Sequence, residues 1–201
     1  MTRIQAVCVY CGSGLGTDPA YAEAARGFGR ILAAAQIRLV YGGGSLGLMG
    51  TLARSVIEHG GKVTGIIPQF LVARERMMRE VDELLVTEDM HARKRAMFDR
   101  ADGFVALPGG LGTLEETVEM LTWAQLGQHE KPVVLANIAG FWQPLIALMT
   151  HMRAEAFIRE GLMARYFVAE TVEQIVPTLK KAAAICKPTD QGAGAPSFSN
   201  L

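Results

Sequence analysis

Two short stretches of the chain combine residue types that can do chemistry together. The stretch "LPGGLGTLEE", 107–116, places three glycines before two adjacent carboxylates, Glu115 and Glu116. The stretch "DMHARKRAMFDR", 89–100, brings the cations Arg93 and Lys94 side by side. A carboxylate can stabilise a developing positive charge or take a proton from water, and a guanidinium can hold phosphate or ribose oxygens through its planar fork. The two stretches are therefore candidates for one site.

Three glycine-rich turns, each directly after a predicted strand, indicate what that site binds. They are "CGSGLG" at 11–16, "GGGSLGLMG" at 42–50 and "PGGLGT" at 108–113. Glycine lets backbone amides approach an anion, and the helix that follows directs its unpaired N–H groups to the same point. Together the turns predict a phosphate-binding cradle. In the third turn Gly109, Gly110 and Gly112 can wrap the phosphate, and the Thr113 hydroxyl adds a donor.

The two glutamates also have a simpler interpretation. We expect the helix after the third turn to start near Gly112, which would put Glu115 and Glu116 in its first turn. There the helix dipole favours a carboxylate by roughly 0.3–1 kcal/mol, with no ligand involved. Both glutamates could be solvated, as could the cations of 89–100. Two carboxylates beside an anion site nevertheless suggest that at least one contacts the ligand beyond its phosphate.

A dinucleotide site is the main alternative for the second turn. Gly42, Gly44 and Gly47 match G-x-G-x-x-G after a strand. That motif needs an acidic residue at the end of the next strand to hold the ribose, but "KVTGII" ends in Pro68 and Gln69. None of the three turns continues into the Gly-Lys-Ser or Gly-Lys-Thr of a Walker A loop. The sequence therefore disfavours both kinds of site.

Composition limits the partners and the compartment. The 201 residues carry 20 basic and 20 acidic side chains, so no net field attracts nucleic acid or an anionic membrane. No apolar segment reaches the roughly 18 to 20 residues of a membrane span, and "MTRIQAVCVY" lacks the layout of a signal peptide. We expect a cytoplasmic protein without a cofactor. We expect no metal site either, because the histidines at 59, 91, 129 and 151 show no ligand spacing.

Cys8 and Cys11 form a C-x-x-C pair that could be a redox pair or half of a zinc site. No second pair or Cys/His cluster completes such a site. Cys8 lies within the apolar run "IQAVCVY", and Cys11 lies where that run meets glycine. We interpret both as packing residues.

The elements that must position these residues form an alternating series. Strands are predicted near 4–10, 37–41, 62–67, 103–107 and 132–137, with a weaker one near 83–87, and helices near 18–35, 47–59, 89–100, 112–127, 141–152 and 171–185. This alternation predicts an α/β fold: a single doubly wound, mainly parallel sheet with helices on both faces, the modified Rossmann type. Ligands of such sheets bind beyond the carboxyl ends of the strands, where all three turns lie.

We expect one nucleotide-binding hydrolytic domain over 1–186, followed by a flexible tail over 187–201. The tail, "KPTDQGAGAPSFSN" and Leu201, has too few apolar side chains to offset its ordering entropy. The segment "TVEMLTWAQLGQ", 117–128, is apolar enough to pack a partner helix, which predicts a homodimer. Met120 and Trp123 within it are expected to be core residues.

With these motifs in place, the sequence resembles the LONELY GUY (LOG) family of cytokinin riboside 5′-monophosphate phosphoribohydrolases, once mislabelled lysine decarboxylases. The resemblance rests on "PGGLGTLEE" at 108–116, which fits the family's PGGxGTxxE, and on "DMHARK" at 89–94. It continues through "VCVYCGSG" at 7–14, "YGGGSLGLMG" at 41–50 and "TWAQLGQHEKPV" at 122–133. It covers residues 4 to about 180 in the family's order and spacing.

The resemblance implies a dimeric modified Rossmann fold that binds an N6-modified adenosine 5′-monophosphate and hydrolyses the bond between base and ribose. A carboxylate near the anomeric carbon would serve that reaction. By position, Arg93 and Glu116 match the family's catalytic pair. The matching substrate contacts are Glu75, Lys94, Gly109, Gly110, Leu111, Gly112, Thr113, Leu114, Glu115 and Thr122, with Ser13, Gly43, Gly44 and Met90 as further candidates. Residues 76–88 are least like the family, which leaves the preferred base open.

Two other functions stay open. One is a nucleotide-binding or sensing module of the same fold without hydrolytic activity, and the other is a general AMP nucleosidase without a cytokinin role. A decarboxylase that uses pyridoxal phosphate is disfavoured, because Lys94 is the one lysine near the predicted site and it adjoins Arg93.

Overall fold

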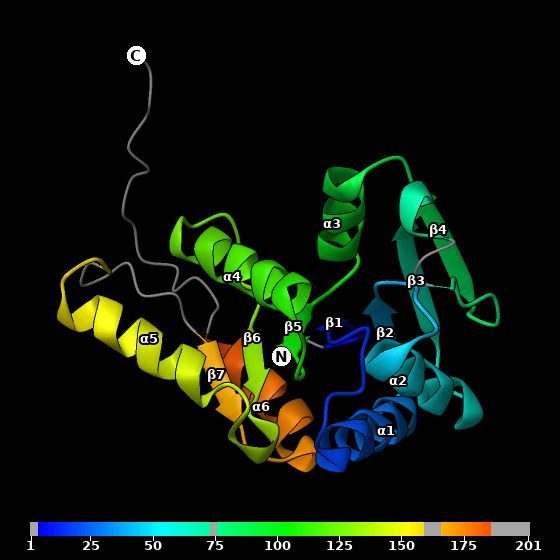
Figure 1. Ribbon diagram of the computed structural model, residues 1–201, viewed down its shortest axis with the longest axis horizontal. Helices are drawn as coiled ribbons and strands as arrows, with labels where there is room; N and C mark the ends of the chain where they lie inside the picture. Colours follow the sequence, from blue (N-terminus) through cyan, green and yellow to red (C-terminus); the bar gives the residue numbers. More distant parts are fainter. Residues whose placement is uncertain (1–3, 73–75, 159–165, 186–201) are drawn as a thin grey trace.

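The computed structural model describes residues 4–72, 76–158 and 166–185, which form one seven-stranded sheet with helices on both faces (Figure 1). Every pair of neighbouring strands is parallel, and the order across the sheet is β4-β3-β2-β1-β5-β6-β7. The predicted doubly wound α/β fold is confirmed. The strands are β1 (Ala6–Tyr10), β2 (Arg38–Tyr41), β3 (Val63–Pro68), β4 (Glu83–Thr87), β5 (Gly103–Ala106), β6 (Val133–Ala136) and β7 (Tyr166–Ala169).

The helices divide between the two faces of the sheet. They are α1 (Pro19–Ala34), α2 (Gly47–Glu58), α3 (Met90–Asp99), α4 (Leu111–Gln125), α5 (Gln143–Ala154) and α6 (Val172–Ile185), with short 3₁₀ turns η1 (Gln69–Leu71) and η2 (Ile138–Gly140). The apolar faces of α1, α2 and α6 pack on one side, and those of α3, α4 and α5 pack on the other (Figure 1). Both faces of the central strands are therefore buried.

Strand alternation decides which face each side chain of β1 joins. Val7 and Val9 pack toward α1 and α2, whereas Cys8 and Tyr10 pack toward α3 and α4. Cys11, three residues after Cys8, joins the α1 side, so the two thiols lie on opposite faces of the sheet. Both are free and buried, and burial raises the pKa of each thiol far above its ordinary value. They act as packing residues, as the sequence predicted.

The structure departs from the predicted elements in one strand. β7 was not predicted, because its four residues "YFVA" form an edge strand that is too short to show a period of two. Its pairing with β6 reveals it. The predicted tail, 187–201, lies outside the described residues.

The order of the strands places the glycine turns at one edge. The chain runs from β1 outward to β4 and then returns to β5, on the other side of β1. The turns after β1 and β5 therefore flank the point where the winding reverses, which is where open α/β sheets form a ligand crevice. The turn after β2 lies directly beside them.

Candidate functional site

The turn after β5 leaves the start of α4 open. Gly110 is the N-cap residue, no side chain caps the helix, and the first N–H group with a helical partner is that of Leu114, which donates to the Gly110 carbonyl. Among the described residues, the N–H groups of Leu111, Gly112 and Thr113 have no hydrogen-bond partner and are thus available to meet an anion. The Leu111 side chain is 85% exposed beside them. This geometry agrees with the predicted phosphate cradle.

The Thr113 side chain has a different place from the one that the sequence suggested. It is buried, and a Cβ atom added to Gly109 would lie 2.2 Å from Thr113 Oγ1 and 2.8 Å from the Gly12 nitrogen. Gly109 is therefore needed for close packing between the first turn, the third turn and α4. Contact of the Thr113 hydroxyl with a phosphate stays a prediction.

The first and third turns together line a pocket of about 280 Å³. The Gly12 N–H group donates to the Pro108 carbonyl at 3.0 Å and ties the two turns together. Tyr21 and Phe141, whose rings meet edge to face, close the pocket on the α1 side. The full lining is Gly12, Ser13, Gly14, Leu15, Gly16, Tyr21, Leu48, Pro108, Gly109, Gly110 and Phe141. The crevice at the reversal point is therefore hollow, and its lining combines the two glycine turns with the apolar side chains of Leu15, Tyr21, Leu48 and Phe141.

The second turn does not contribute a free helix start. The N–H groups of Leu48 and Met49, at the start of α2, donate to the Gly12 carbonyl at 3.0 and 3.3 Å, and that of Leu48 also reaches the Gly14 carbonyl at 3.2 Å. The expectation that the helix starts after the glycine turns all offer N–H groups to a phosphate is corrected here, because these N–H groups already donate to carbonyls of the first turn.

Gly43 and Gly44 also have protein partners. The Gly43 carbonyl accepts from the Met78 N–H group at 3.0 Å, and Gly44 forms an isolated bridge with Met77. These bonds hold the segment after η1 against the second turn. Contact of Gly43 or Gly44 with a nucleotide stays a prediction.

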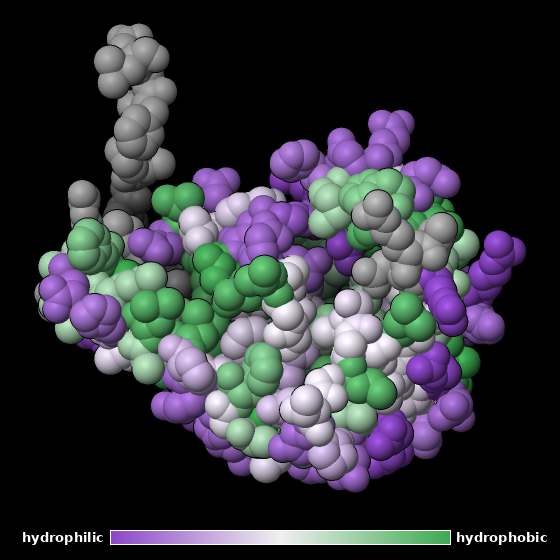
Figure 2. Space-filling model, viewed as in Figure 1, coloured by the Kyte–Doolittle hydropathy of each residue, from purple (hydrophilic) through white to green (hydrophobic). Residues whose placement is uncertain are grey.

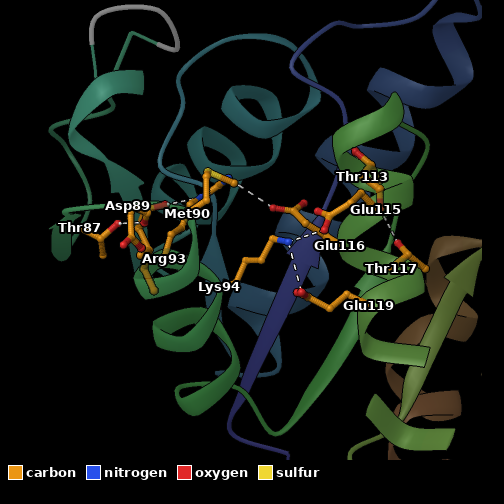
Figure 3. Close-up of polar contacts among 11 residues, drawn as sticks. Thr87, Asp89, Met90, Arg93, Lys94, Thr113, Glu115, Glu116, Thr117 and Glu119 are labelled. Carbon is orange, nitrogen blue, oxygen red and sulfur yellow. Dashed lines mark hydrogen bonds and ion pairs between the residues drawn. The ribbon is translucent and has the colours of Figure 1, made fainter. Parts of the chain in front are cut away.

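Arg93 and Glu116 meet across the gap between α3 and α4 (Figure 3). Arg93 Nη1 lies 3.4 Å from Glu116 Oε1, and each residue is only 8% exposed. Asp89 caps α3 by accepting from the Ala92 N–H group at 2.8 Å, which fixes the helix that carries Arg93. The predicted catalytic pair is thus one buried ion pair at the carboxyl edge of the sheet.

Burial tunes the acidity of Glu116. It raises the pKa of this carboxyl to about 7, against the opposing effect of the nearby Arg93 guanidinium. A carboxyl with this pKa can exchange a proton near neutral pH, as a general acid or base must. Because α4 begins at Leu111, Glu115 and Glu116 lie in its second turn rather than its first. Their predicted place in the first turn is therefore wrong, and the helix dipole favours them less than that place would imply, since its effect fades beyond the first turn.

Lys94 lies between two carboxylates of α4 (Figure 3). It forms an ion pair with Glu115 Oε1, and its Nζ is 3.3 Å from Glu119 Oε1. Glu119 was not singled out from the sequence, although its spacing of four from Glu115 puts both on the same helix face. Its other oxygen, Oε2, is buried and has no hydrogen-bond partner among the residues that the structure describes.

The remaining predicted contacts are distributed unevenly. Met90 lies next to the pair, with its sulfur 3.8 Å from Arg93 Nη1. Leu114 instead packs toward Trp142, and its N–H group is already bonded. Thr122 is exposed, bonds to the Val118 carbonyl at 2.8 Å, and lies about 16 Å along α4 from its start at 1.5 Å per residue. Glu75 lies outside the described residues.

The described part of the chain, 4–72, 76–158 and 166–185, contains no group of three or more His, Cys, Asp or Glu side chains that could hold a metal ion. In the same ranges no helix combines the length and the apolar character needed to cross a membrane.

Comparison with known sequences points to one group of enzymes. A family model described as "Possible lysine decarboxylase" matches residues 49–179. The rice (Oryza sativa subsp. japonica) cytokinin riboside 5′-monophosphate phosphoribohydrolase LOG is 43% identical over 180 residues, 90% of this chain and 74% of that protein. The cytokinin riboside 5′-monophosphate phosphoribohydrolase of Rhodococcoides fascians is 41% identical over 177 residues, 88% of this chain and 89% of that protein.

Comparison with solved structures shows how widely the fold is used. The Moco carrier protein of Chlamydomonas reinhardtii superposes with a TM-score of 0.66 at 25% identity, covering 91% of this chain and 99% of that one. The molybdenum cofactor binding protein of Rippkaea orientalis gives 0.63 at 22% identity, with coverages of 90% and 98%. This chain thus shares its fold with structures named as a cofactor carrier and a cofactor binding protein, so the fold alone does not identify its function.

Proposed function

Since this chain belongs to the LONELY GUY family of cytokinin riboside 5′-monophosphate phosphoribohydrolases, we propose that it hydrolyses the N-glycosidic bond of N6-modified adenosine 5′-monophosphates. The products are the free base and ribose 5-phosphate. The observation that carries the proposal is the buried Arg93–Glu116 pair beside an open, glycine-lined helix start.

Each part of the site has a role in this reaction. The free N–H groups at the start of α4 bind the phosphate, together with the pocket between the first and third turns. Ser13 and Gly110 line that pocket. Arg93 holds ribose or phosphate oxygens with its fork, which fixes the sugar relative to Glu116. Positioning and charge stabilisation are therefore supplied by different elements, α3 and α4.

Glu116 acts on the anomeric carbon. As the bond from that carbon to the base nitrogen breaks, positive charge builds on the sugar, and the Glu116 carboxylate stabilises it. The carboxylate also takes a proton from the attacking water, whose oxygen bonds to the carbon. The departing base takes up a proton from solvent at its nitrogen and Glu116 returns its proton to solvent, so that one water is consumed per turnover. A pKa of about 7 keeps enough carboxylate present at neutral pH.

The proposal is tested by product analysis. Purified protein is incubated with isopentenyl-AMP, AMP, the unphosphorylated nucleoside and a panel of pyrimidine monophosphates, and released base is measured by chromatography. We expect free base from the N6-modified monophosphate and little from the nucleoside, because the nucleoside has nothing for the α4 helix start to bind. No base from any purine monophosphate would contradict the proposal.

The same panel decides between the open alternatives. Equal or faster release of adenine from AMP in competition with isopentenyl-AMP would favour a general AMP nucleosidase. Saturable nucleotide binding without base release would favour a binding module, a use of the fold that the names of the carrier structures illustrate. The Arg93–Glu116 pair supports hydrolysis over simple binding, since binding alone does not call for a buried carboxyl with a pKa near 7.

We further propose that the chain forms a homodimer. Apolar side chains are exposed on α4 and at its end, Val118 and Leu126, and on α5, Leu148 and Met152. Figure 2 shows apolar surface over α5, on the left of that view. Such a surface favours a partner that covers it. Light scattering of the purified chain tests the assembly, and cell fractionation tests the predicted cytoplasmic location.

A further inference from the structure

The Arg93 guanidinium is contacted on three sides. Its Nε–H group donates to the Ile66 carbonyl at 3.2 Å, and its Nη1 faces Glu116 Oε1 at 3.4 Å. The third side is the backbone of Gly42, the first residue after β2. A Cβ atom built on Gly42 would lie 2.3 Å from Arg93 Nη2. The fork therefore rests directly on the Cα of Gly42.

We propose that Gly42 is a positioning residue. Because it has no side chain, the Arg93 guanidinium can lie against its backbone and stay aligned with Glu116. This inference rests on the proposed function, because it assigns a role in that same site. It also gives the second glycine turn a purpose other than phosphate binding, which fits the observation that the N–H groups of Leu48 and Met49 in the helix after it are already bonded.

Backbone conformation does not explain the glycine. Gly43 and Gly47 have positive φ angles of 77° and 57°, which disfavour other residues, but Gly42 is not among the positive-φ glycines. The atoms that an alanine side chain at position 42 would approach are Arg93 Nη2 at 2.3 Å and Met49 Sδ at 3.1 Å. Both are ends of flexible side chains. An alanine should therefore be accommodated by the fold at the expense of the fork position.

The expected cost is catalytic. Moving the fork from Gly42 breaks its alignment with either the Ile66 carbonyl or Glu116. A misplacement of about 1 Å in a positioning group can cost up to about 100-fold in rate. We expect Gly42→Ala to lower kcat by about 10- to 100-fold while KM changes less, because the phosphate contacts at α4 stay intact.

A double-mutant cycle separates this role from a general structural one. In the Arg93→Ala background the fork is absent, so adding Gly42→Ala should change neither kcat nor the melting temperature further. Should Gly42→Ala alone lower the melting temperature, the effect should likewise vanish in that background. The control is Gly27→Ala, on α1 and outside the site, where the nearest added contact is Val172 Cγ2 at 3.3 Å. It should leave kcat unchanged.

A second readout does not depend on enzymatic activity. The Arg93 Nε–H group is buried and bonded, so its proton should exchange slowly in ¹⁵N–¹H spectra of the wild-type chain, and Gly42→Ala should shift its signal and speed its exchange. If the wild type released no base, the proposed function would fail, but this measurement would still test whether Gly42 positions the Arg93 guanidinium. Wild-type kcat in Gly42→Ala, an unmoved Nε–H signal, or an equal loss in both backgrounds would overturn the inference.

Discussion

The starts of α2 and α4 look alike in sequence and differ in what they can do. Both follow a buried strand and a glycine-rich turn. At α2, the N–H groups of Leu48 and Met49 are bonded to the first turn, and Gly47 is pressed against the Ser13 carbonyl. At α4, the first N–H groups are free, and a Cβ on Gly110 or Gly112 would meet nothing within 4 Å. One start is packed, and the other is open.

The difference shows that glycine serves two separate purposes in this fold. In the second turn the absent side chains make room for protein: Ser13 at Gly47, the Arg93 fork at Gly42 and Ile67 at Gly43. In the third turn, Gly110 and Gly112 leave space that is still empty for a ligand. Glycine substitutions should therefore affect stability or fork position at α2, and ligand affinity at α4. The following experiments test that division, beginning with Glu116 of the Arg93–Glu116 pair, which lies on α4.

The largest expected effect is that of Glu116→Gln, on the second turn of α4. The amide keeps the shape of the side chain but cannot take a proton or carry negative charge. We expect nucleotide binding to be retained and kcat to fall by about 100-fold or more, the usual scale for an acid–base group. Single-turnover rates and equilibrium binding of isopentenyl-AMP measure the two quantities separately. Wild-type turnover by this variant would remove Glu116 from the mechanism.

Gly47→Ala, at the packed start of α2, should lower the free energy of unfolding more than it changes the catalytic rate. Its φ of 57° costs a non-glycine residue about 1–2 kcal/mol. In addition, the new Cβ would lie 2.2 Å from the Ser13 carbonyl carbon, which is backbone and cannot easily move. We expect a drop of at least that size in the free energy of unfolding, measured by urea denaturation. An unchanged midpoint would contradict the packed description of α2.

Gly112→Ala is the matched change at the open start. The added Cβ meets nothing in the protein, and alanine favours helix over glycine by about 1 kcal/mol, so unfolding should become no easier. Because the methyl group enters the space of the predicted phosphate, we expect KM to rise with little change in kcat. Steady-state kinetics and urea denaturation check both parts. A loss of stability with an unchanged KM would reverse the comparison between α2 and α4.

The pH dependence of kcat/KM should report the environment of Glu116. Its pKa of about 7 and its role as a carboxylate predict that kcat/KM rises as pH increases toward 7 and levels off above it. The limb belongs to the free enzyme, so it is best measured at low substrate concentration. If kcat/KM instead rose around the ordinary pKa of a glutamate, the catalytic base would be another group or a carboxyl that is not buried.

The smallest effects should come from Lys94 and Glu119, which flank the pair. The Lys94 cation lowers the pKa of Glu116 and the Glu119 carboxylate raises it. Lys94→Gln should therefore move the limb of the pH profile upward, and Glu119→Gln should move it downward, each by less than about one pH unit. The solvent-exposed change Glu130→Gln serves as the control. Shifts of the same sign in both variants would contradict this assignment.

The sequence predicted much of the fold because the pattern and the packing agree. Continuous apolar runs such as "GFVA" indicate strands buried on both faces, and their alternation with helical segments indicates a parallel sheet. Short, half-buried β7 lacks that redundancy and was missed. The start of α4 was placed one residue late, near Gly112 instead of Leu111, and both Glu115 and Glu116 lie beyond its first turn.

The residue types of the site were determined by the sequence alone: an arginine, a glutamate and a glycine-lined helix start in the order that the family uses. Only the tertiary structure decided the rest. It determines which amides stay free, which carboxyl is buried beside which cation, and why Gly42 has no side chain. The physical reason is that these properties depend on partners far apart in the chain. The Leu48 N–H group is taken by Gly12, and the Arg93 fork lies on Gly42 between Ile66 and Glu116, across three separate elements.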